Sequence, residues 1–150
     1  MKRSTKGASG ALTDDLDFLI RDTRLRLYKY IEGRIARQRI PLRIWFPLRA
    51  LYENEGITQR ELGRMLGFGD ARAGVIVGVM LRHRLVVRQA SRVDRRRINL
   101  YLTPAGKKMA RQALKHRRSI EAQITAGFTA AEIDAMKALL LRARANLAAQ

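Results

Sequence analysis

The stretch Val86–Thr103, which reads VVRQASRVDRRRINLYLT, decides the fold. It contains two apolar runs, Val86–Val87 and Ile98–Leu102, on either side of a polar tip. In the second run three aliphatic residues alternate with Asn99 and Tyr101, which is the period of a half-buried strand. The stretch therefore predicts two short strands joined by a polar loop.

The tip of this hairpin is strongly basic. Five arginines fall between positions 88 and 97, and Asp94 is the only acid among them. The wider segment from Arg88 to Arg118 contains eleven lysines or arginines and no further acid. A two-stranded loop tipped with arginines suits a polyanion, and the groove of a nucleic acid is the obvious one. The alternative is that the charge serves only to solvate the surface.

The chain has 150 residues, a formal net charge of +18 and a pI of about 11.6. This length suits one domain with its own core, or a subunit that borrows core from a partner. A folded monomer with such a charge would repel itself, so the composition favours an anionic partner. It does not choose between DNA, RNA and a membrane surface.

The sequence argues against several other classes of protein. It contains no cysteine, which excludes disulfides and thiolate metal sites. Its longest nearly apolar run, Ala73–Leu81, has nine residues, far below the roughly 20 that span a bilayer. His83 and His116 are far apart, and the glycines match no phosphate-binding motif. We therefore expect a cytoplasmic protein without enzymatic activity, catalytic residues, metal, cofactor or membrane contact.

Apolar periodicity predicts helices on both sides of the hairpin. Residues 1–10 precede them and are expected to form a flexible basic arm. The expected helices cover about residues 13–37, 42–54, 58–66, 70–84, 104–126 and 129–149.

Capping residues mark where these helices begin. Thr58 and Glu61 have the T-x-x-E spacing of a capping box, and Thr129 and Glu132 repeat it. At the other starts we expect two caps and one favoured first residue: Thr13, Asp70 and Pro104.

A short helix–turn–helix followed at once by a basic hairpin is a winged helix. The expected fold is mainly α (α+β), with a winged-helix core at about 40–103 inside one domain, 11–150. The helices at about 13–37 and 104–149 carry apolar stripes without an obvious partner in so small a unit. A second copy of the chain would cover them, which predicts a homodimer. The alternative is that they pack on each other within one subunit.

Three segments resemble the MarR family of transcription regulators, in the family's order. IPLRIWFPLRAL (Ile40–Leu51) is similar to the motif of the second helix, and GITQRELGRMLGF (Gly56–Phe68) to the first helix of the helix–turn–helix. DRRRINLYLTPAGKKM (Asp94–Met109) matches most closely, with its Asp-Arg-Arg tip, alternating strand and Leu-Thr-x-x-Gly entry to the next helix. The resemblance implies a dimeric repressor that binds double-stranded DNA and releases it when a small ligand binds.

Four arginines and one acid of the hairpin are candidate DNA-binding residues. Arg96 is the leading candidate for insertion into a narrow minor groove, where the negative potential is enhanced. Asp94 either orients a neighbouring guanidinium through a charge-assisted hydrogen bond or only terminates the turn. The remaining hairpin candidates are expected to contact phosphates or water: Arg92, Arg95 and Arg97.

The recognition helix is expected at about 70–84 and offers few polar side chains. Arg72 is its only long donor near the start, Gly74 allows close approach of the backbone, and Val75 suits a thymine methyl group. Arg84 stands where the family often has a helix-ending glycine. Periodicity assigns four further residues to the core: Ala73, Ile76, Val77 and Met80.

Thr58, Gln59 and Arg60 begin the preceding helix, where phosphate contacts are expected, although Thr58 is equally explained as a cap. For the ligand, the resemblance points to a pocket near the dimerisation helices, lined by Tyr28, Arg43, Trp45 and Phe46. Aromatic walls and one cation suit an aromatic acid or an acyl-coenzyme A ester, whereas Trp45 is equally explained as core.

Two other functions compete with a repressor. One is a sequence-independent nucleoid- or RNA-associated protein that relies on charge alone. The other is a winged helix used for contact with another protein.

Overall fold

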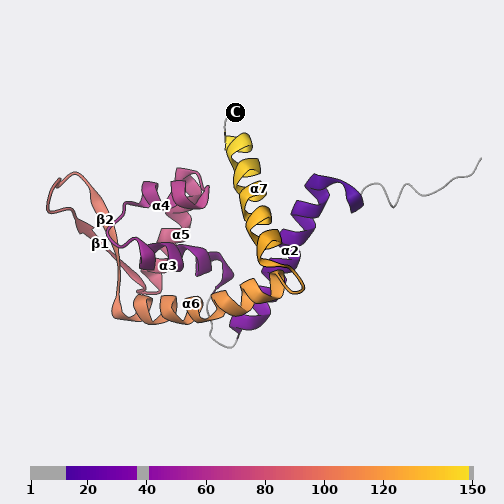
Figure 1. Ribbon diagram of the computed structural model, residues 1–150. Coiled ribbons are helices and arrows are strands. Elements are labelled where there is room, and N and C mark those ends of the chain that lie inside the picture. Colours follow the sequence, from indigo (N-terminus) through magenta and orange to yellow (C-terminus); the bar gives the residue numbers. More distant parts are fainter. Residues whose placement is uncertain (1–12, 37–40, 149–150) are drawn as a thin grey trace, which may run out of the picture. The chain divides into compact units, whose positions relative to one another are not determined.

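The computed structural model describes residues 13–36 and 41–148, so the expected basic arm at 1–10 lies outside the described residues. Six helices and two strands follow one another within this part of the chain: α2 (Leu16–Ile35), α3 (Leu42–Glu53), α4 (Gln59–Leu66), α5 (Asp70–Arg82), β1 (Val86–Ala90), β2 (Ile98–Leu102), α6 (Pro104–Ile124) and α7 (Ala130–Ala148). The order confirms the predicted winged helix (Figure 1). The chain divides into two compact units, and the division falls after His116, inside α6.

The hairpin β1–β2 is antiparallel, with Val86 opposite Leu102 and Ala90 opposite Ile98. Its first strand is longer than the apolar run Val86–Val87 predicted. It continues through three polar or small residues because the second strand satisfies their backbone groups. The hairpin extends beyond the cluster of α3, α4 and α5 at the left of Figure 1.

The core of the first unit forms where α3, α4, α5 and the hairpin meet. Its fully buried side chains come from every one of these elements and include Trp45, Leu48, Leu51, Leu62, Val77, Met80 and Leu100. The four residues of α5 that periodicity assigned to the core are all buried. Val79 joins them, which leaves α5 with a narrow exposed face.

The two predicted capping boxes are present. The Thr58 hydroxyl accepts from the Glu61 N–H, and the Glu61 carboxylate accepts from the Thr58 N–H. Thr129 and Glu132 exchange the same pair of bonds at the start of α7.

The single caps expected at Asp70 and Thr13 are wrong. Gly69 is the N-cap of α5 and Asp15 that of α2, and neither makes a side-chain cap bond. Asp70 is instead the first residue of α5, where its carboxylate lies 3.4 Å from the Arg60 guanidinium. The cap position, which needs extended backbone, is held by Gly69, one residue before the expected one.

Helix α5 ends at Arg82, and two residues later Arg84 has the left-handed backbone angle φ 53°. The Arg84 N–H donates to the Leu81 carbonyl and the Leu85 N–H to the Met80 carbonyl, which together form a Schellman motif. Glycine is the usual residue at this position, since a side chain adds steric cost. This explains the family's preference for glycine where the present chain has arginine.

The Leu-Thr-x-x-Gly sequence locks the start of α6 onto this turn. The Thr103 hydroxyl donates to the Arg84 carbonyl over 2.7 Å and accepts from the Gly106 N–H over 3.0 Å. Gly106 is buried, and a Cβ there would overlap the carbonyl group of Leu85. Only glycine lets α6 approach so closely.

We predict that Gly106→Ala lowers the free energy of unfolding by about 2–3 kcal/mol, because backbone atoms must move to admit the methyl group. Gly33→Ala is the matched control, since nothing lies within 4 Å of a Cβ at this helical position. Urea unfolding of both variants measures the difference. Equal stability of the two variants would contradict the packing described for the α5–α6 junction.

Large apolar side chains are exposed on two long helices, α2 in the first unit and α7 in the second. Helix α2 buries only Ile31 and Ile35 and exposes four others: Leu16, Leu19, Ile20 and Leu25. Helix α7 buries none of its residues in the described chain and exposes Leu139, Leu140, Leu141 and Leu147. Across the described residues, no helix combines the length and apolar character needed to cross a membrane.

Candidate nucleic-acid interface

A concave surface of about 500 Å³ lies between the starts of α4 and α5 and the hairpin. We call it the groove, and its lining residues are Thr58, Gln59, Arg60, Asp70, Arg88, Arg96, Arg97, Ile98 and Leu100. Four of these nine residues are arginines, and one is an acid. The groove brings together five predicted DNA-binding residues: Thr58, Gln59, Arg60, Arg96 and Arg97.

Backbone hydrogen bonds hold the hairpin beside the start of α4. The Leu100 N–H donates to the Ile57 carbonyl over 2.8 Å, and the Gly56 N–H donates to the Leu100 carbonyl over 3.0 Å. Thr58 and Asn99 continue this pairing as an isolated antiparallel bridge. The segment before α4 thus acts as a short third strand. It fixes the hairpin and the start of α4, which line two sides of the groove, to each other.

Glu61 ties the hairpin to α4 through its side chain. One carboxylate oxygen accepts from the N–H and the hydroxyl of Thr58, and the other accepts from the Arg97 guanidinium over 2.6 Å. The hydrogen bond from the Thr58 N–H, then that from its hydroxyl and then the Arg97 guanidinium lower the pKa of Glu61 below its ordinary value. Arg97, predicted as a phosphate contact, is therefore paired with an acid, and Thr58 serves as a cap.

A second side-chain bond joins the hairpin to α4. The Arg88 guanidinium donates to the Gln59 side-chain oxygen over 3.0 Å. Arg88 is a functional candidate that sequence reasoning missed, because its partner lies 29 residues away along the chain. The sequence offered one indication of its role: Arg88 stands in the first strand, apart from the other four arginines of the hairpin.

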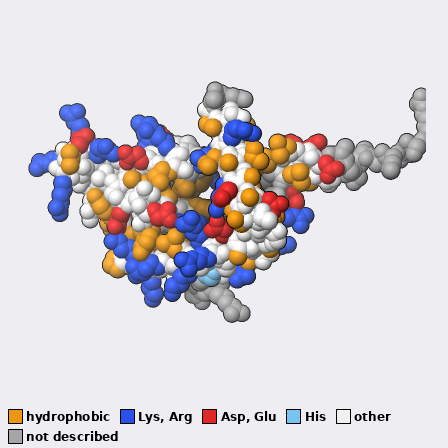
Figure 2. Space-filling view, viewed as in Figure 1, with side chains coloured by type: hydrophobic (Ala, Val, Ile, Leu, Met, Phe, Trp, Pro, Cys, Tyr) orange, Lys and Arg blue, Asp and Glu red, His pale blue; other side chains and the backbone are white. Residues whose placement is uncertain are grey.

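The loop at the tip is organised by Asp94 and Ser91. The Asp94 carboxylate accepts from the Arg96 backbone N–H over 2.9 Å, and the Asp94 carbonyl accepts from the Arg97 N–H. These two contacts of Asp94 match the turn-terminating alternative. Arg92 and Arg95 are exposed in this loop, and Lys and Arg side chains gather at its end in Figure 2. These two arginines lie outside the groove lining.

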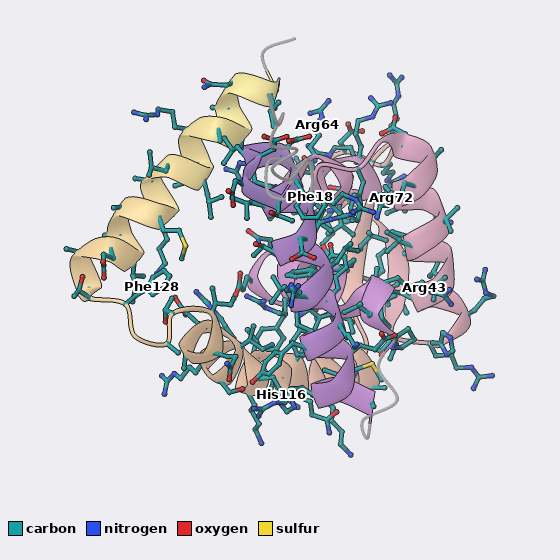
Figure 3. The ribbon with its side chains drawn as sticks, turned by 90° about the vertical axis from the view of Figure 1, so that its right-hand side faces the viewer. Phe18, Arg43, Arg64, Arg72, His116 and Phe128 are labelled. Carbon is teal, nitrogen blue, oxygen red and sulfur yellow. The ribbon has the colours of Figure 1, made fainter. Side chains whose placement is uncertain are left out.

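Helix α5 carries no charge in its middle, from Ala73 to Leu81. Val75 is 66% exposed, and Gly74 is half-buried beside it. The Arg72 guanidinium, labelled in Figure 3, lies 4.3 Å from the centre of the Phe68 ring, a cation–π distance. Phe68 therefore gives the one long donor at the start of α5 a defined position.

The four predicted ligand-binding residues do not converge on one point. The Tyr28 and Phe46 rings lie 6.3 Å apart, whereas Trp45 is fully buried and lies 6.1 Å from the His116 ring. Arg43 is exposed in the first turn of α3 (Figure 3). Trp45 therefore matches the core alternative.

Two other arginines accompany the Tyr28–Phe46 pair. The Arg24 guanidinium lies 5.5 Å from the Tyr28 ring centre, and the Arg49 guanidinium lies 6.0 Å from that of Phe46. Sequence reasoning missed both, although each is one helical turn from its aromatic partner.

We predict that the stabilising effect of the Glu61 charge disappears in acid. Because the folded-state pKa is lowered, the contribution is complete above the unfolded value and is lost as the pH falls through the folded value. Glu61→Gln keeps hydrogen-bonding groups but mimics the protonated carboxyl. Melting temperatures of both proteins between pH 7 and pH 3 should therefore converge at low pH, with the parent more stable at pH 7. A constant difference over this range would contradict the assignment.

Comparison with known proteins finds a family whose sequence model matches the middle of this chain. The sequence model of the MarR family matches residues 46–97, which contain the helix–turn–helix and most of the hairpin. None of the curated proteins compared with the chain matches it.

Solved structures share the fold along most of the chain. A structure described as a probable transcriptional regulator from Pseudomonas aeruginosa is 27% identical, with a TM-score of 0.74, over 87% of this chain and 98% of its own. MepR of S. aureus, solved in complex with DNA, is 21% identical with a TM-score of 0.81, over 89% of this chain and 98% of its own.

BpsR of Bordetella bronchiseptica, whose DNA binding is regulated by 6-hydroxynicotinic acid, is 17% identical with a TM-score of 0.79. That similarity covers 88% of this chain and 94% of BpsR. The match to the family model over the helix–turn–helix and most of the hairpin, and the fold shared with these solved structures, make this chain similar to the MarR family.

Proposed function

We propose that this protein is a homodimeric transcription repressor that binds double-stranded DNA through the groove, the hairpin and the exposed face of α5. The observation that carries the proposal is the groove itself, where four arginines from two elements surround the start of a helix. Arginines and the N-terminal N–H groups of a helix both favour phosphate oxygens. The DNA complex of MepR supports the same kind of partner for this chain.

Each part of the surface has a distinct task in this proposal. The small residues Gly74 and Val75 let α5 lie deep in a major groove, where Val75 contacts a thymine methyl group and Arg72 supplies a donor. The tip loop follows the backbone into the neighbouring minor groove. Arg96 is the inserted arginine, because the bond from its N–H to Asp94 fixes its backbone. Arg92 and Arg95 contact phosphates.

Association of two copies accounts for the exposed leucines of α2 and α7. Faces of this kind are unfavourable in water, and a self-complementary contact between two copies would cover them. A two-fold dimer presents two grooves, which suits two DNA half-sites about 34–36 Å apart. The competing function is charge-driven binding to DNA or RNA without sequence choice, which requires neither regular spacing nor base preference.

Selection of duplexes from a random pool should yield a two-fold symmetric sequence, with half-sites about one helical turn apart. Arg96→Ala should weaken binding to that duplex roughly tenfold at fixed salt without loss of the dimer. Arg26→Ala is the control, since Arg26 is paired with Asp22 on α2, away from the hairpin. Equal affinity of the parent for selected and scrambled duplexes would support the charge-driven alternative instead.

We also propose that a small aromatic acid, free or as a coenzyme A ester, controls DNA binding. The Tyr28 and Phe46 rings offer an aromatic surface beside which a ligand ring packs, and the Arg24 and Arg49 guanidinium groups near them suit a carboxylate. The regulation of BpsR by 6-hydroxynicotinic acid supports a ligand of this chemical class.

Thermal-shift titration with aromatic acids and their coenzyme A esters should raise the melting temperature for at least one compound, since a ligand that binds only the folded state stabilises it. Phe46→Ala should abolish that shift, whereas Arg43→Ala should retain it because Arg43 lies outside the aromatic pair. Absence of a shift with every compound would remove support for ligand control. An unchanged shift in Phe46→Ala would place the ligand elsewhere.

A further inference from the structure

Arg88 of the first strand and Gly74 of α5 both lie beside one side chain, that of Gln59. We propose that the Gln59 amide is a specificity-determining, base-reading group, held in place by Arg88 and admitted by the absence of a side chain at Gly74. This inference rests on the proposed function, but it assigns Gln59 a different task from the phosphate contact expected from sequence.

Arg88 determines which end of the Gln59 amide is available. A guanidinium group can only donate hydrogen bonds, so the atom it contacts at 3.0 Å must be the amide oxygen. The NH₂ group of Gln59 therefore points away from Arg88. It lies on the side of α5, where an ideal Cβ at position 74 would be 3.3 Å from the Gln59 nitrogen.

Gly74 has a clear physical role in this arrangement. Glycine is a poor residue for a helix interior, so its presence in α5 needs a reason. A methyl group at this position would make a tighter contact with the Gln59 nitrogen than side chains ordinarily tolerate. Gly74 is half-buried and lies next to the exposed Val75, so the amide of another helix occupies the outer surface of α5.

The amide supplies a polar group that α5 lacks. Between Arg72 and Arg82, α5 presents the exposed Val75 and the half-buried Gly74 and Gly78, none of which has a polar side chain. The Gln59 NH₂ group lies against this face and also lines the groove. When α5 occupies a major groove, these donors reach the same base edges that a polar residue at position 74 would reach.

The held orientation also selects the kind of base. A glutamine that is free to turn pairs with adenine through both ends of its amide, since adenine offers a donor and an acceptor in the major groove. Here the Arg88 guanidinium holds the oxygen on its own side of the amide, so the end that faces α5 is the NH₂ group, which presents only donors. Guanine offers two acceptors, N7 and O6. Gln59 therefore reads guanine at one position of each half-site.

Selection from a random pool, followed by affinity measurements on single-base variants of the selected duplex, tests this assignment. The parent should prefer guanine at one position of each half-site, and Gln59→Ala should reduce that preference roughly tenfold while preferences at other positions remain. Arg88→Met and Gly74→Ala should reduce preference at the same position, because the first frees the amide and the second displaces it. Gln89→Ala, an exposed glutamine of β1, is the matched control and should change nothing.

The results that would overturn the inference are distinct. If Gln59→Ala keeps every base preference, or weakens all duplexes equally as loss of a phosphate contact would, Gln59 does not read a base. If the parent shows no base preference at any position, the proposed repressor function fails together with this inference. Circular dichroism and melting temperatures of the variants exclude loss of folding as the cause of any change.

Discussion

The pairing of the Leu100 backbone with the segment before α4 is the constraint on which the proposed interface depends. Two hydrogen bonds, to Ile57 and from Gly56, fix the second strand of the hairpin beside the start of a helix. Glu55 adds a third link, because its carboxylate accepts from the Leu102 N–H and pairs with Lys107 of α6. The basic tip therefore extends from a fixed base, and Arg97 has a defined position relative to α4.

The few acids of this basic protein act largely as positioning groups for its cations and backbone. Glu61 holds Arg97, Asp70 lies beside Arg60, and Asp94 holds the backbone of the tip loop. Exposed ion pairs of this kind contribute little to stability, but they reduce the number of conformations that a long side chain samples. This distinguishes an ordered DNA-binding surface from a merely cationic one. This positioning role also explains how the groove can be strongly basic and still contain an acid, Asp70.

Features set by residues close in sequence could be predicted, and features set by distant residues could not. The capping box at Thr58 and the core face of α5 depend on spacings of three or four residues, and both were predicted correctly. The cap expected at Asp70 was wrong because α5 begins one residue earlier, with Gly69 in the extended backbone of an N-cap. The partners of Arg88 and Arg97 lie 29 and 36 residues away, and no local pattern indicates them. Trp45 and Phe46 were both assigned to a ligand pocket from the family resemblance, yet neighbours on a helix point about 100° apart, and Trp45 lies in the core.

The central claim is that the groove, the hairpin and the face of α5 form one DNA-binding surface, and NMR titration of the labelled full chain with a duplex tests it most directly. The account predicts that the side-chain amide of Gln59 and the backbone amides of Val75, Arg88 and Arg96 shift together at the same duplex concentrations. Shifts confined to the lysines and arginines of α6, with these four groups unchanged, would contradict it.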